Sequence, residues 1–480
     1  MMDKCSDERP NIVKPWSFEQ IRRVTLSRWV SRGSRQFSGR ISTDSRQVQE
    51  GDLFIAIRGK NHNSHIFIPQ VIAAGAAGIL SDQPPDQEVV QTLSQGLVSI
   101  LQCDNTIRGM NRLAAAYRRD IRARVIAVGG SNGKTTTKQM IHTLLSTRLS
   151  GIASPKSFNN NIGLPLTLLS VEPQHEYVIL EVGTNAPGEV AALGHVAAPD
   201  IVVITSVGLE HLEFLGDLKS VAREEASLAR FVAHDGILFL TNESPELLAA
   251  LRLFKVPRFT VGPGSSGADL EATLIEQSMD GLNFVVNGRS EYRLAMFGRH
   301  NVFNVLLAMG VARRFGLTDE EIAAGISAIK PPSMRMEPQR LGSHFVLNDA
   351  YNANPTSMAR ALETFAGLPL NNSGGPALVR RVAILGDMLE LGPRSGEFHS
   401  QVGEEAVRYR FDLLLAVGPL MKHAADAVSA GRLPVRHFPD TAAAVEQLPS
   451  LLKPDDAILI KASRGMGLEK LLPVIESVGG

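Results

Sequence analysis

The segment 124–145 joins an apolar run, a glycine-rich turn and a helical pattern, and it constrains the fold more than any other part of the chain. The run RVIAV at 124–128 has the composition of a buried strand. The turn GGSNG follows, and KTTTKQMIHTLL at 134–145 predicts a helix. Such a unit directs backbone N–H groups and the positive end of the helix dipole at one point. The sequence therefore predicts a phosphate-binding loop within an α/β fold.

The turn matches the pattern G-x-x-G-K-T, which is shorter than the full P-loop pattern because Val128 stands where that pattern has glycine. Lys134 is expected to reach the β- and γ-phosphates of a nucleotide, and Thr135 to ligate Mg²⁺. The alternative is an ordinary strand–helix turn with an exposed lysine. The residues expected to bind nucleotide in this loop are Gly129, Gly130, Ser131, Asn132, Gly133, Lys134 and Thr135.

Further apolar runs alternate with helical segments on both sides of a proline pair, Pro331-Pro332. These runs lie at 52–57, 177–182, 200–206, 236–240, 258–261, 344–349, 381–386, 412–418 and 456–462. Alternation of this kind is typical of parallel sheets, and 480 residues exceed the size of a single core. Thr318 and Glu321 fit a helix capping box, and 371–376 is expected to be a surface loop. With a hinge at the prolines, the predicted domains are 1–120, 121–332 and 333–480.

Charge and composition exclude several classes of function. The 49 basic residues balance 49 acidic ones, so the chain as a whole has no electrostatic attraction to nucleic acid or to an anionic membrane. Cys5 and Cys103 are its only cysteines, which favours a reducing compartment over a disulfide framework. No apolar run approaches the roughly 18 residues of a membrane span, and the charged N-terminus does not resemble a signal peptide. A cytoplasmic protein is expected.

Two further polar residues follow predicted strands. Glu181 stands at the end of the run 177–182, and His211 follows the run 200–206. The carboxyl ends of strands are where open α/β sheets bind ligands, and a carboxylate there can hold Mg²⁺ directly or through water. A single histidine is more often structural than a ligand, so from the residues alone both roles of His211 stay open.

Together these motifs resemble the Mur ligase family of ATP-dependent amide-bond-forming enzymes, from about residue 40 to the C-terminus. The motifs that carry the likeness are GGSNGKT (129–135), NNIGLPLTLL (160–169), LEVG (180–183), EHLE (210–213), GRHNVFN (298–304), NDAYNANPTSM (348–358), LGDMLELG (385–392) and KASRGMGLE (461–469). Within the family, DAYNANPTSM and GDMLELG are similar to enzymes that add D-alanyl-D-alanine to UDP-N-acetylmuramoyl-tripeptide. The D-N-P-R motif of the ligase that acts one step earlier is absent from this sequence.

The resemblance implies three α/β domains: a small N-terminal UDP-binding domain, a central P-loop ATPase-type domain with a parallel sheet, and a C-terminal Rossmann-like domain. It also implies a chemistry, in which ATP activates a peptide carboxylate as an acyl phosphate that an amine then attacks. The implied cofactors are ATP and Mg²⁺, and the implied substrates are UDP-N-acetylmuramoyl-tripeptide and D-alanyl-D-alanine. A monomer without a nucleic-acid partner is expected, acting in peptidoglycan precursor synthesis.

The resemblance assigns roles to residues along the whole chain. Around ATP and its metal ions it places Lys134, Thr135, Glu181 and His211, with Asn301 and Asn304 on the adenine side, Arg335 at the phosphates in a closed form, and Asp349 at the ribose. Around the other substrates it places Ser45 and Arg46 at UDP, Asn160 and Asn161 at the muramoyl-peptide, and Tyr351, Asn352, Asn354 and His399 at the dipeptide. Simple helix capping is the alternative for the pair at 301 and 304, and also for Asn354 followed by Pro355.

Position 225 departs from the family pattern. Many members carry, fourteen residues after the metal-binding histidine, a lysine that is carbamylated by CO₂. This chain has Glu225 there, and a glutamate offers a carboxylate without any modification. We expect Glu225 to join Lys134, His211 and Arg335 as a catalytic residue. The alternative is that Glu224 and Glu225 belong to a solvated helix face.

Two other functions could use the same loop. Folylpolyglutamate synthase shares the chemistry, but TDSRQ at 43–47 and DAYNANP at 349–355 argue against it. A regulatory nucleotide-binding module would not need flanking domains, nor Arg335 and Asp349 beyond the hinge. The sequence therefore favours a ligase.

Overall fold

The computed structural model describes residues 16–59, 62–84, 96–369, 380–428, 431 and 433–479, so the predicted loop at 371–376 lies outside the described residues. The chain forms two compact units. The first consists of Met1–Ala127, Leu149–Val182 and Ala192–Asp200. The second consists of Val128–Arg148, Gly183–Ala191 and Ile201–Gly480. Most of the residues that carry the predicted chemistry belong to the second unit.

The first unit contains a five-stranded sheet with the order β1-β5-β4-β3-β2. Its strands are β1 (Arg28–Ser31), β2 (Ile41–Ser42), β3 (Leu53–Ile55), β4 (Gly78–Ser81) and β5 (Ser99–Gln102), and its helices are α1 (Phe18–Thr25), α2 (Ile68–Ala73) and α4 (Thr106–Arg118). Only β1 runs antiparallel to its neighbour in this sheet. Phe54, Ile79 and Ile100 are buried in one cluster with residues of α2, so a small α/β core forms as predicted.

A nine-stranded sheet has the order β14-β13-β12-β11-β10-β9-β6-β8-β7. Its strands are β6 (Arg124–Gly129), β7 (Gly151–Ala153), β8 (Tyr177–Glu181), β9 (Ile201–Ile204), β10 (Ile237–Thr241), β11 (Arg258–Pro263), β12 (Leu270–Ser278), β13 (Gly281–Val286) and β14 (Ser290–Leu294). The helices of these segments are α5 (Lys134–Leu145), α6 (Gly163–Leu169), α7 (Glu189–Ala197), α8 (Leu212–Leu215), α9 (Leu218–Ala226), α10 (Pro245–Leu251), α11 (His300–Arg314) and α12 (Asp319–Ala328). The predicted strands at 124–128, 177–182, 200–206, 236–240 and 258–261 are all present.

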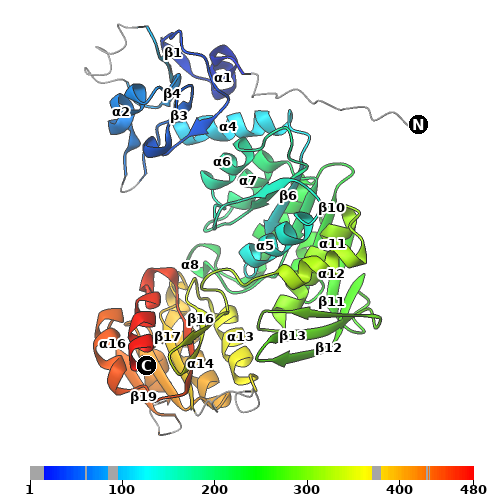
Figure 1. Ribbon diagram of the computed structural model, residues 1–480, viewed down its shortest axis with the longest axis vertical. Coiled ribbons are helices and arrows are strands. Elements are labelled where there is room, and N and C mark those ends of the chain that lie inside the picture. Colours follow the sequence, from blue (N-terminus) through cyan, green and yellow to red (C-terminus); the bar gives the residue numbers. More distant parts are fainter. Residues whose placement is uncertain are drawn as a thin grey trace. The chain divides into compact units, whose positions relative to one another are not determined.

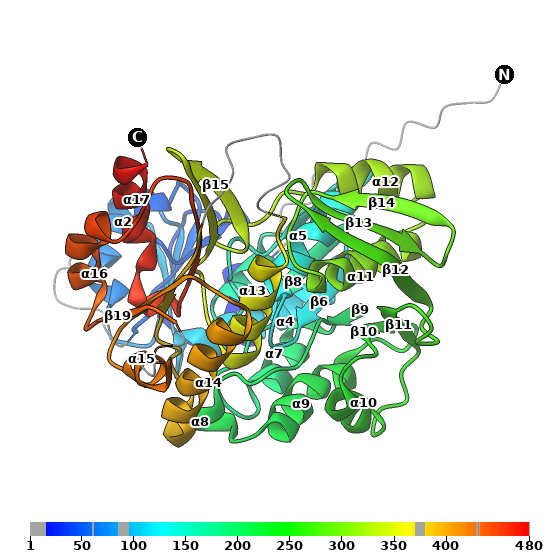
Figure 2. The same ribbon diagram turned by 90° about the horizontal axis from the view of Figure 1, so that it is seen from below.

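This sheet is mixed, whereas the sequence analysis expected a parallel one. Strands β9 to β12 pair in parallel, but β12, β13 and β14 form an antiparallel meander, which Figure 2 shows beside α11 and α12. The physical reason is a tight turn after β13, where Asn287 (φ 50°) and Gly288 (φ 65°) both adopt left-handed backbone conformations. An Asn-Gly pair with two positive φ angles is the preferred two-residue hairpin turn.

The C-terminal part of the second unit contains a six-stranded sheet, β15-β16-β20-β17-β18-β19, drawn yellow to red in Figure 1. Its strands are β15 (Glu337–Leu341), β16 (His344–Asp349), β17 (Arg380–Gly386), β18 (Leu413–Val417), β19 (Val435–Phe438) and β20 (Asp456–Lys461), and its helices are α13 (Pro355–Ala366), α14 (Ser395–Arg408), α15 (Lys422–Val428), α16 (Thr441–Gln447) and α17 (Leu472–Val478). All pairs are parallel except β15 with β16. Ala383 and Leu385 join one apolar cluster and Val382 and Ile384 another, because successive side chains of β17 point to opposite faces. Both faces are covered, as in a Rossmann-like domain.

Two predicted helix starts are confirmed. Thr318 and Glu321 form a capping box at α12, with each side chain accepting from the backbone N–H of the other residue, at 3.2 and 2.8 Å. Asn354 caps α13, where its Oδ1 accepts from the Ser357 N–H at 2.8 Å. Among the described helices, none is long and apolar enough to cross a membrane.

Candidate active site

The loop between β6 and α5 is shaped by two glycines and by the end of β9. Gly130 (φ 113°) and Gly133 (φ 89°) adopt left-handed conformations, which L side chains rarely adopt. A Cβ atom on Gly130 would lie 2.3 Å from Thr205 Oγ1, so a side chain has no room there. The Thr205 hydroxyl donates to the carbonyl of Asn132 at 2.6 Å, which ties the loop to the sheet. The loop thus keeps the geometry of an anion-binding turn.

Lys134 is the first residue of α5, and its ammonium group lies back over the loop. Its Nζ donates to the carbonyl oxygens of Gly130 and Ser131 at 2.5 and 3.3 Å and lies 3.8 Å from Glu210 Oε1. The side chain is only 14% exposed. The alternative of an exposed lysine in an ordinary turn is therefore wrong, and a positive charge stands at the predicted phosphate site.

Glu225, on α9, is fully buried against the same loop. Its Oε2 accepts from the Gly130 N–H at 2.7 Å, whereas its Oε1 has no hydrogen-bond partner among the described residues. Burial raises the pKa of Glu225, although the charge of Lys134 and the bond from Gly130 oppose the rise. A Cβ atom on Gly129 would lie only 3.0 Å from Glu225 Oε2. The alternative of a solvated helix face is wrong for this residue.

A second buried carboxyl group, Glu210, adjoins the loop and was not singled out from the sequence. Burial raises its pKa to about 8 even though Lys134 lowers it, and the charge of Glu225 contributes to the rise. The loop is therefore bordered by one ammonium group and two desolvated carboxyl groups. Such a cluster is typical of a functional site.

His211 caps the short helix α8 with a left-handed backbone (φ 50°). Its Nδ1 lies 2.6 Å from Glu390 Oε2, and the side chain is 18% exposed. Burial lowers the pKa of His211, while Glu390 raises it. A carboxylate on Nδ1 fixes the tautomer that leaves Nε2 as an acceptor. Glu390 lies in the motif GDMLELG, but its pairing with a residue 179 positions away could not be inferred from the sequence.

Glu181 belongs to the first unit, where it ends β8 and is 1% exposed. Its Oε1 accepts from Asn159 Nδ2 at 3.1 Å. Its role at the ATP-bound metal ion stays a prediction. Within the ranges that the structure describes, no three His, Cys, Asp or Glu residues gather into a possible metal cluster. A metal ion here would take part of its coordination shell from phosphate and water, as Mg²⁺ often does.

Arg335 and Asp349, beyond the proline pair, are held by specific partners. Arg335 Nη2 donates to Thr135 Oγ1 at 3.1 Å, and its guanidinium lies 4.1 Å above the Tyr351 ring. Asp349 Oδ2 accepts from Lys461 Nζ at 2.6 Å. The structure thus brings Arg335 to the predicted phosphate loop, and the Tyr351 ring packs against its guanidinium group. Lys461 is a further charged residue that the sequence analysis did not identify.

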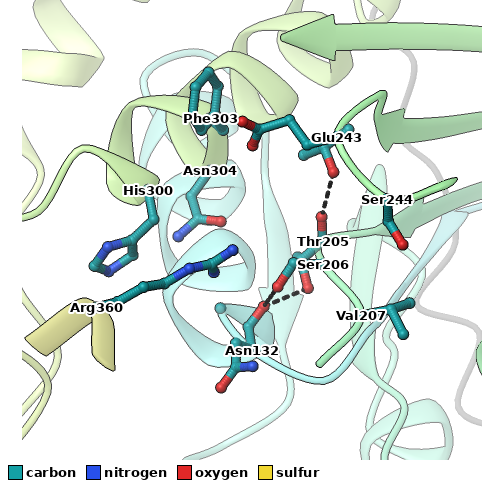
Figure 3. A pocket seen from close by; sticks show the side chains of 12 residues that line it. Asn132, Thr205, Ser206, Val207, Glu243, Ser244, His300, Phe303, Asn304 and Arg360 are labelled. Carbon is teal, nitrogen blue, oxygen red and sulfur yellow. Dashed lines mark hydrogen bonds between the residues drawn. The ribbon is translucent and has the colours of Figure 1, made fainter. Parts of the chain in front are cut away.

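A pocket beside the loop contains one of the two predicted adenine-side asparagines (Figure 3). It is lined among others by Asn132, Thr205, Glu243, His300, Asn304 and Arg360. Asn304 Nδ2 donates to Asn301 Oδ1 at 2.9 Å, and Asn301 Nδ2 donates to the Phe297 carbonyl at 2.7 Å. Neither asparagine caps α11, whose N-cap residue is Arg299, so the capping alternative is wrong. Asn301 orients Asn304, and Asn304 faces the pocket.

Asn354 links the helix α13 to the loop in addition to capping that helix. Its Nδ2 donates to Asn132 Oδ1 at 2.9 Å. The backbone carbonyl of Asn352 accepts from Lys461 Nζ at 2.9 Å. Contacts of this kind do not test the predicted roles of Asn352, Asn354 and Tyr351 at a dipeptide, which stay predictions.

His399 lies in a different setting from the other predicted dipeptide residues. It is fully buried, with Nδ1 2.7 Å from the Ser395 carbonyl and Nε2 accepting from the Met388 N–H at 3.0 Å. Burial lowers the pKa of His399, so the ring is kept neutral. Both ring nitrogens therefore make hydrogen bonds with the backbone. Contact of His399 with a dipeptide stays a prediction.

The four substrate residues predicted in the first unit lie in loops and turns. Arg46, in the 3₁₀ turn Ser45–Gln47, is exposed and pairs with Asp44 at 2.7 Å, which lowers the pKa of Asp44 to about 2. Asn160 Oδ1 accepts from the Gly163 N–H at 2.9 Å, and the carbonyl of Asn161 accepts from Asn111 Nδ2 at 2.8 Å. Their contacts with substrate stay predictions.

Comparison with known proteins gives concordant matches in three successive segments. Residues 39–118 match the model described as Mur ligase family, catalytic domain; residues 128–312 match Mur ligase middle domain; and residues 334–464 match Mur ligase, glutamate ligase domain. The predicted α/β class with three domains agrees with these matches. The predicted boundaries near 120 and 332 are not tested by them.

Individual relatives cover nearly the whole chain. UDP-N-acetylmuramoyl-tripeptide–D-alanyl-D-alanine ligase of Bacillus subtilis is 33% identical over 446 residues, which are 91% of this chain and 93% of the relative. The ligase of the same name from Escherichia coli is 31% identical over 448 residues, 92% of this chain and 94% of the relative. A crystal structure of MurF from Acinetobacter baumannii has a TM-score of 0.85 and 27% identity, and the match covers 97% of this chain and 99% of that one.

Proposed function

The chain belongs to the Mur ligase family, and we propose that it joins D-alanyl-D-alanine to the peptide of UDP-N-acetylmuramoyl-tripeptide while ATP is converted to ADP and phosphate. Two observations together support this proposal. The chain aligns with such ligases over nearly their whole length, and Lys134 and Arg335 bring two positive charges to the phosphate loop. The reaction belongs to peptidoglycan precursor synthesis, which we expect to take place in the cytoplasm.

Charge neutralisation is the first task of the site. The terminal carboxylate of the tripeptide and the γ-phosphate of ATP are both anions and repel each other at close range. Lys134 Nζ exchanges the carbonyl oxygens of Gly130 and Ser131 for phosphate oxygens when ATP binds. Arg335 adds a second positive charge from beyond the proline pair. Groups fixed in advance around the transferring phosphoryl group stabilise its transition state.

The bond changes are those of acyl phosphate formation followed by aminolysis. An oxygen of the tripeptide carboxylate attacks the γ-phosphorus, and ADP leaves. The amine of D-alanyl-D-alanine then adds to the activated carbonyl carbon, which gives a tetrahedral intermediate. After the nitrogen has lost a proton to water or to the departing phosphate, collapse of the intermediate forms the amide and releases phosphate, which carries the attacking carboxylate oxygen with it.

The residues around the loop fit a magnesium ion. The unpartnered, buried Oε1 of Glu225 is a hard oxygen donor at the phosphate loop, and the Thr135 hydroxyl is another. We propose that Thr135 and Glu181 serve the ion bound with ATP, that His211 serves a second ion, and that Glu225 supports the site directly or through water. Mg²⁺, when bound, would neutralise phosphate charge during transfer.

Dependence on both substrates tests the function as a whole. Phosphate release should require UDP-N-acetylmuramoyl-tripeptide and D-alanyl-D-alanine together, measured with each omitted in turn. Two tripeptides that differ in their diamino acid would define which precursor is used. ATP hydrolysis that is insensitive to both substrates would instead identify a regulatory nucleotide-binding module.

Isotope transfer is the direct check on the acyl phosphate. With ¹⁸O in the terminal carboxylate of the tripeptide, one labelled oxygen should appear in each released phosphate, as read by mass spectrometry. The control places the label in water, which should leave the phosphate unlabelled. Label retained entirely in the peptide product would rule the intermediate out.

Loss of the Arg335 side chain should separate binding from turnover. Arg335 donates a hydrogen bond to Thr135 at the start of α5 from beyond the proline pair, so Arg335→Ala should reduce ATP affinity by less than it reduces kcat. We expect a loss in kcat of about a hundredfold, the size typical for one charged group that acts on the transition state. Equal losses in ATP affinity and in kcat would contradict this role. Exposed Arg314→Ala is the matched control.

A further inference from the structure

We propose that Arg360 is a further nucleotide-binding residue, which contacts the phosphate of ATP nearest the nucleoside. The inference rests on the proposed function, because it takes ATP as the ligand of the pocket beside the loop. Arg360 lies in the middle of α13, and neither its position in the sequence nor its motif marked it as functional.

The pocket is built from elements that lie far apart in the sequence. Asn132 and Gly133 come from the phosphate loop, His300 and Asn304 from α11, and Arg360 from α13. In Figure 3 the Arg360 side chain points from its helix into this pocket. Because the loop marks the phosphate end of a bound nucleotide, a group that enters the pocket beside Asn132 and Gly133 can reach a phosphate.

The Arg360 guanidinium lacks a fixed counter-charge. Within the described part of the chain, no hydrogen bond or ion pair holds it, and Glu243 and Glu363 act on it only through space. Burial lowers the pKa of Arg360, which shows that its charge is poorly solvated. A guanidinium carries five N–H donors and no acceptor, so the partner that would satisfy it is an anion.

The other groups of the pocket do not supply this charge. Desolvation, together with the positive charges of Arg360 and Lys461, lowers the pKa of His300 to about 3. The histidine is therefore neutral near pH 7. Asn304 is uncharged, and Lys134 lies over the carbonyl oxygens of Gly130 and Ser131, where the β- and γ-phosphates are expected. Arg360 is thus the positive charge that the pocket itself offers to a nucleotide.

The helix that carries Arg360 is already attached to the loop. Asn354, at its N-terminus, donates to Asn132 Oδ1 at 2.9 Å, and Thr356 Oγ1 accepts from the Leu209 N–H at 3.3 Å. These bonds hold the first turn of α13. A bond from Arg360 to a phosphate would add a nucleotide-dependent attachment one turn further along, so that ATP itself stabilises the docked position of α13.

Calorimetric titration of the full chain with ADP, AMP and adenosine tests the proposal. Arg360→Gln should weaken ADP and AMP by the same factor, about ten- to a hundredfold for one charged hydrogen bond, and leave adenosine unchanged. Arg360→Lys, which keeps the charge, should recover part of the loss. The matched control is Arg436→Gln, an exposed arginine on β19. Thermal unfolding checks that each variant is folded.

Three outcomes would overturn the proposal. Unchanged affinity for both ADP and AMP in Arg360→Gln would show that the residue does not bind nucleotide. An equal loss for adenosine would place Arg360 at the base or ribose, and a loss for ADP without one for AMP would place it at the β-phosphate. If the unaltered protein bound none of these ligands while it was folded, the proposed function itself would fail, which is a distinguishable result.

Discussion

Lys134→Ala is expected to lower kcat by about two to three orders of magnitude while the chain remains folded, since the loss of one preorganised charge typically costs several kcal/mol of transition-state stabilisation. The lysine donates directly to the loop carbonyls of Gly130 and Ser131. Without it, the site loses the ammonium group that neutralises phosphate charge and that lowers the pKa of both Glu210 and Glu225.

The measurement is the rate of phosphate release with saturating tripeptide and dipeptide. Lys219→Ala is the matched control, because Lys219 lies exposed on α9 in the same unit. Circular dichroism and the midpoint of thermal unfolding establish that the Lys134 variant is folded. Near-normal ligation by a folded variant would mean that the loop between β6 and α5 does not bind the γ-phosphate.

Glu225→Ala is the second change with a large expected effect. It removes the carboxylate that accepts from the Gly130 N–H and leaves that buried amide unpaired, which typically costs about 1–3 kcal/mol. It also removes the buried oxygen that we assign to the metal site. We expect turnover to fall at least about tenfold, and the Mg²⁺ concentration for half-maximal rate to rise, as each 1.36 kcal/mol changes a rate about tenfold.

Glu225→Gln separates the two roles of this carboxylate. Its amide oxygen can still accept from Gly130, but the negative charge is lost, so the Mg²⁺ requirement should rise while the fold is retained. Exposed Glu404→Ala serves as control. Activity of the unaltered protein should be the same in CO₂-depleted buffer and with added bicarbonate. Stimulation by bicarbonate, or a fully active Glu225→Ala protein, would contradict the assignment.

Local patterns allowed much of the fold to be predicted. The strand–turn–helix unit, the alternating apolar runs, the capping box at Thr318 and the N-cap at Asn354 depend on residues close together in the sequence, and all are present. The adjacent Asn287 and Gly288 are also a local hairpin signal, but the prediction of a parallel sheet left this signal out. The error came from extending the strand–helix alternation of a parallel sheet over β12 to β14, which form an antiparallel meander.

Tertiary pairs at the site could not be predicted in the same way. Glu225 and Gly130 are 95 positions apart, and His211 and Glu390 are 179 apart. No periodicity connects such residues, because their contact depends on how whole elements pack. Family resemblance suggested where Glu225 belongs, but only the structure gave its bond to the loop. Arg360 shows the limit most clearly, since nothing about its position on α13 indicated a pocket.

The close approach of Glu225 to Gly129 also makes the residues that these two positions can hold depend on each other. With only 3.0 Å between a Cβ at 129 and Glu225 Oε2, even an alanine there would require the carboxylate, which accepts from the Gly130 amide, to shift by a few tenths of an ångström. A larger residue at 129 would need a larger shift, so whether it fits depends on the side chain at 225. The residue at one of the two positions therefore limits what the other can hold.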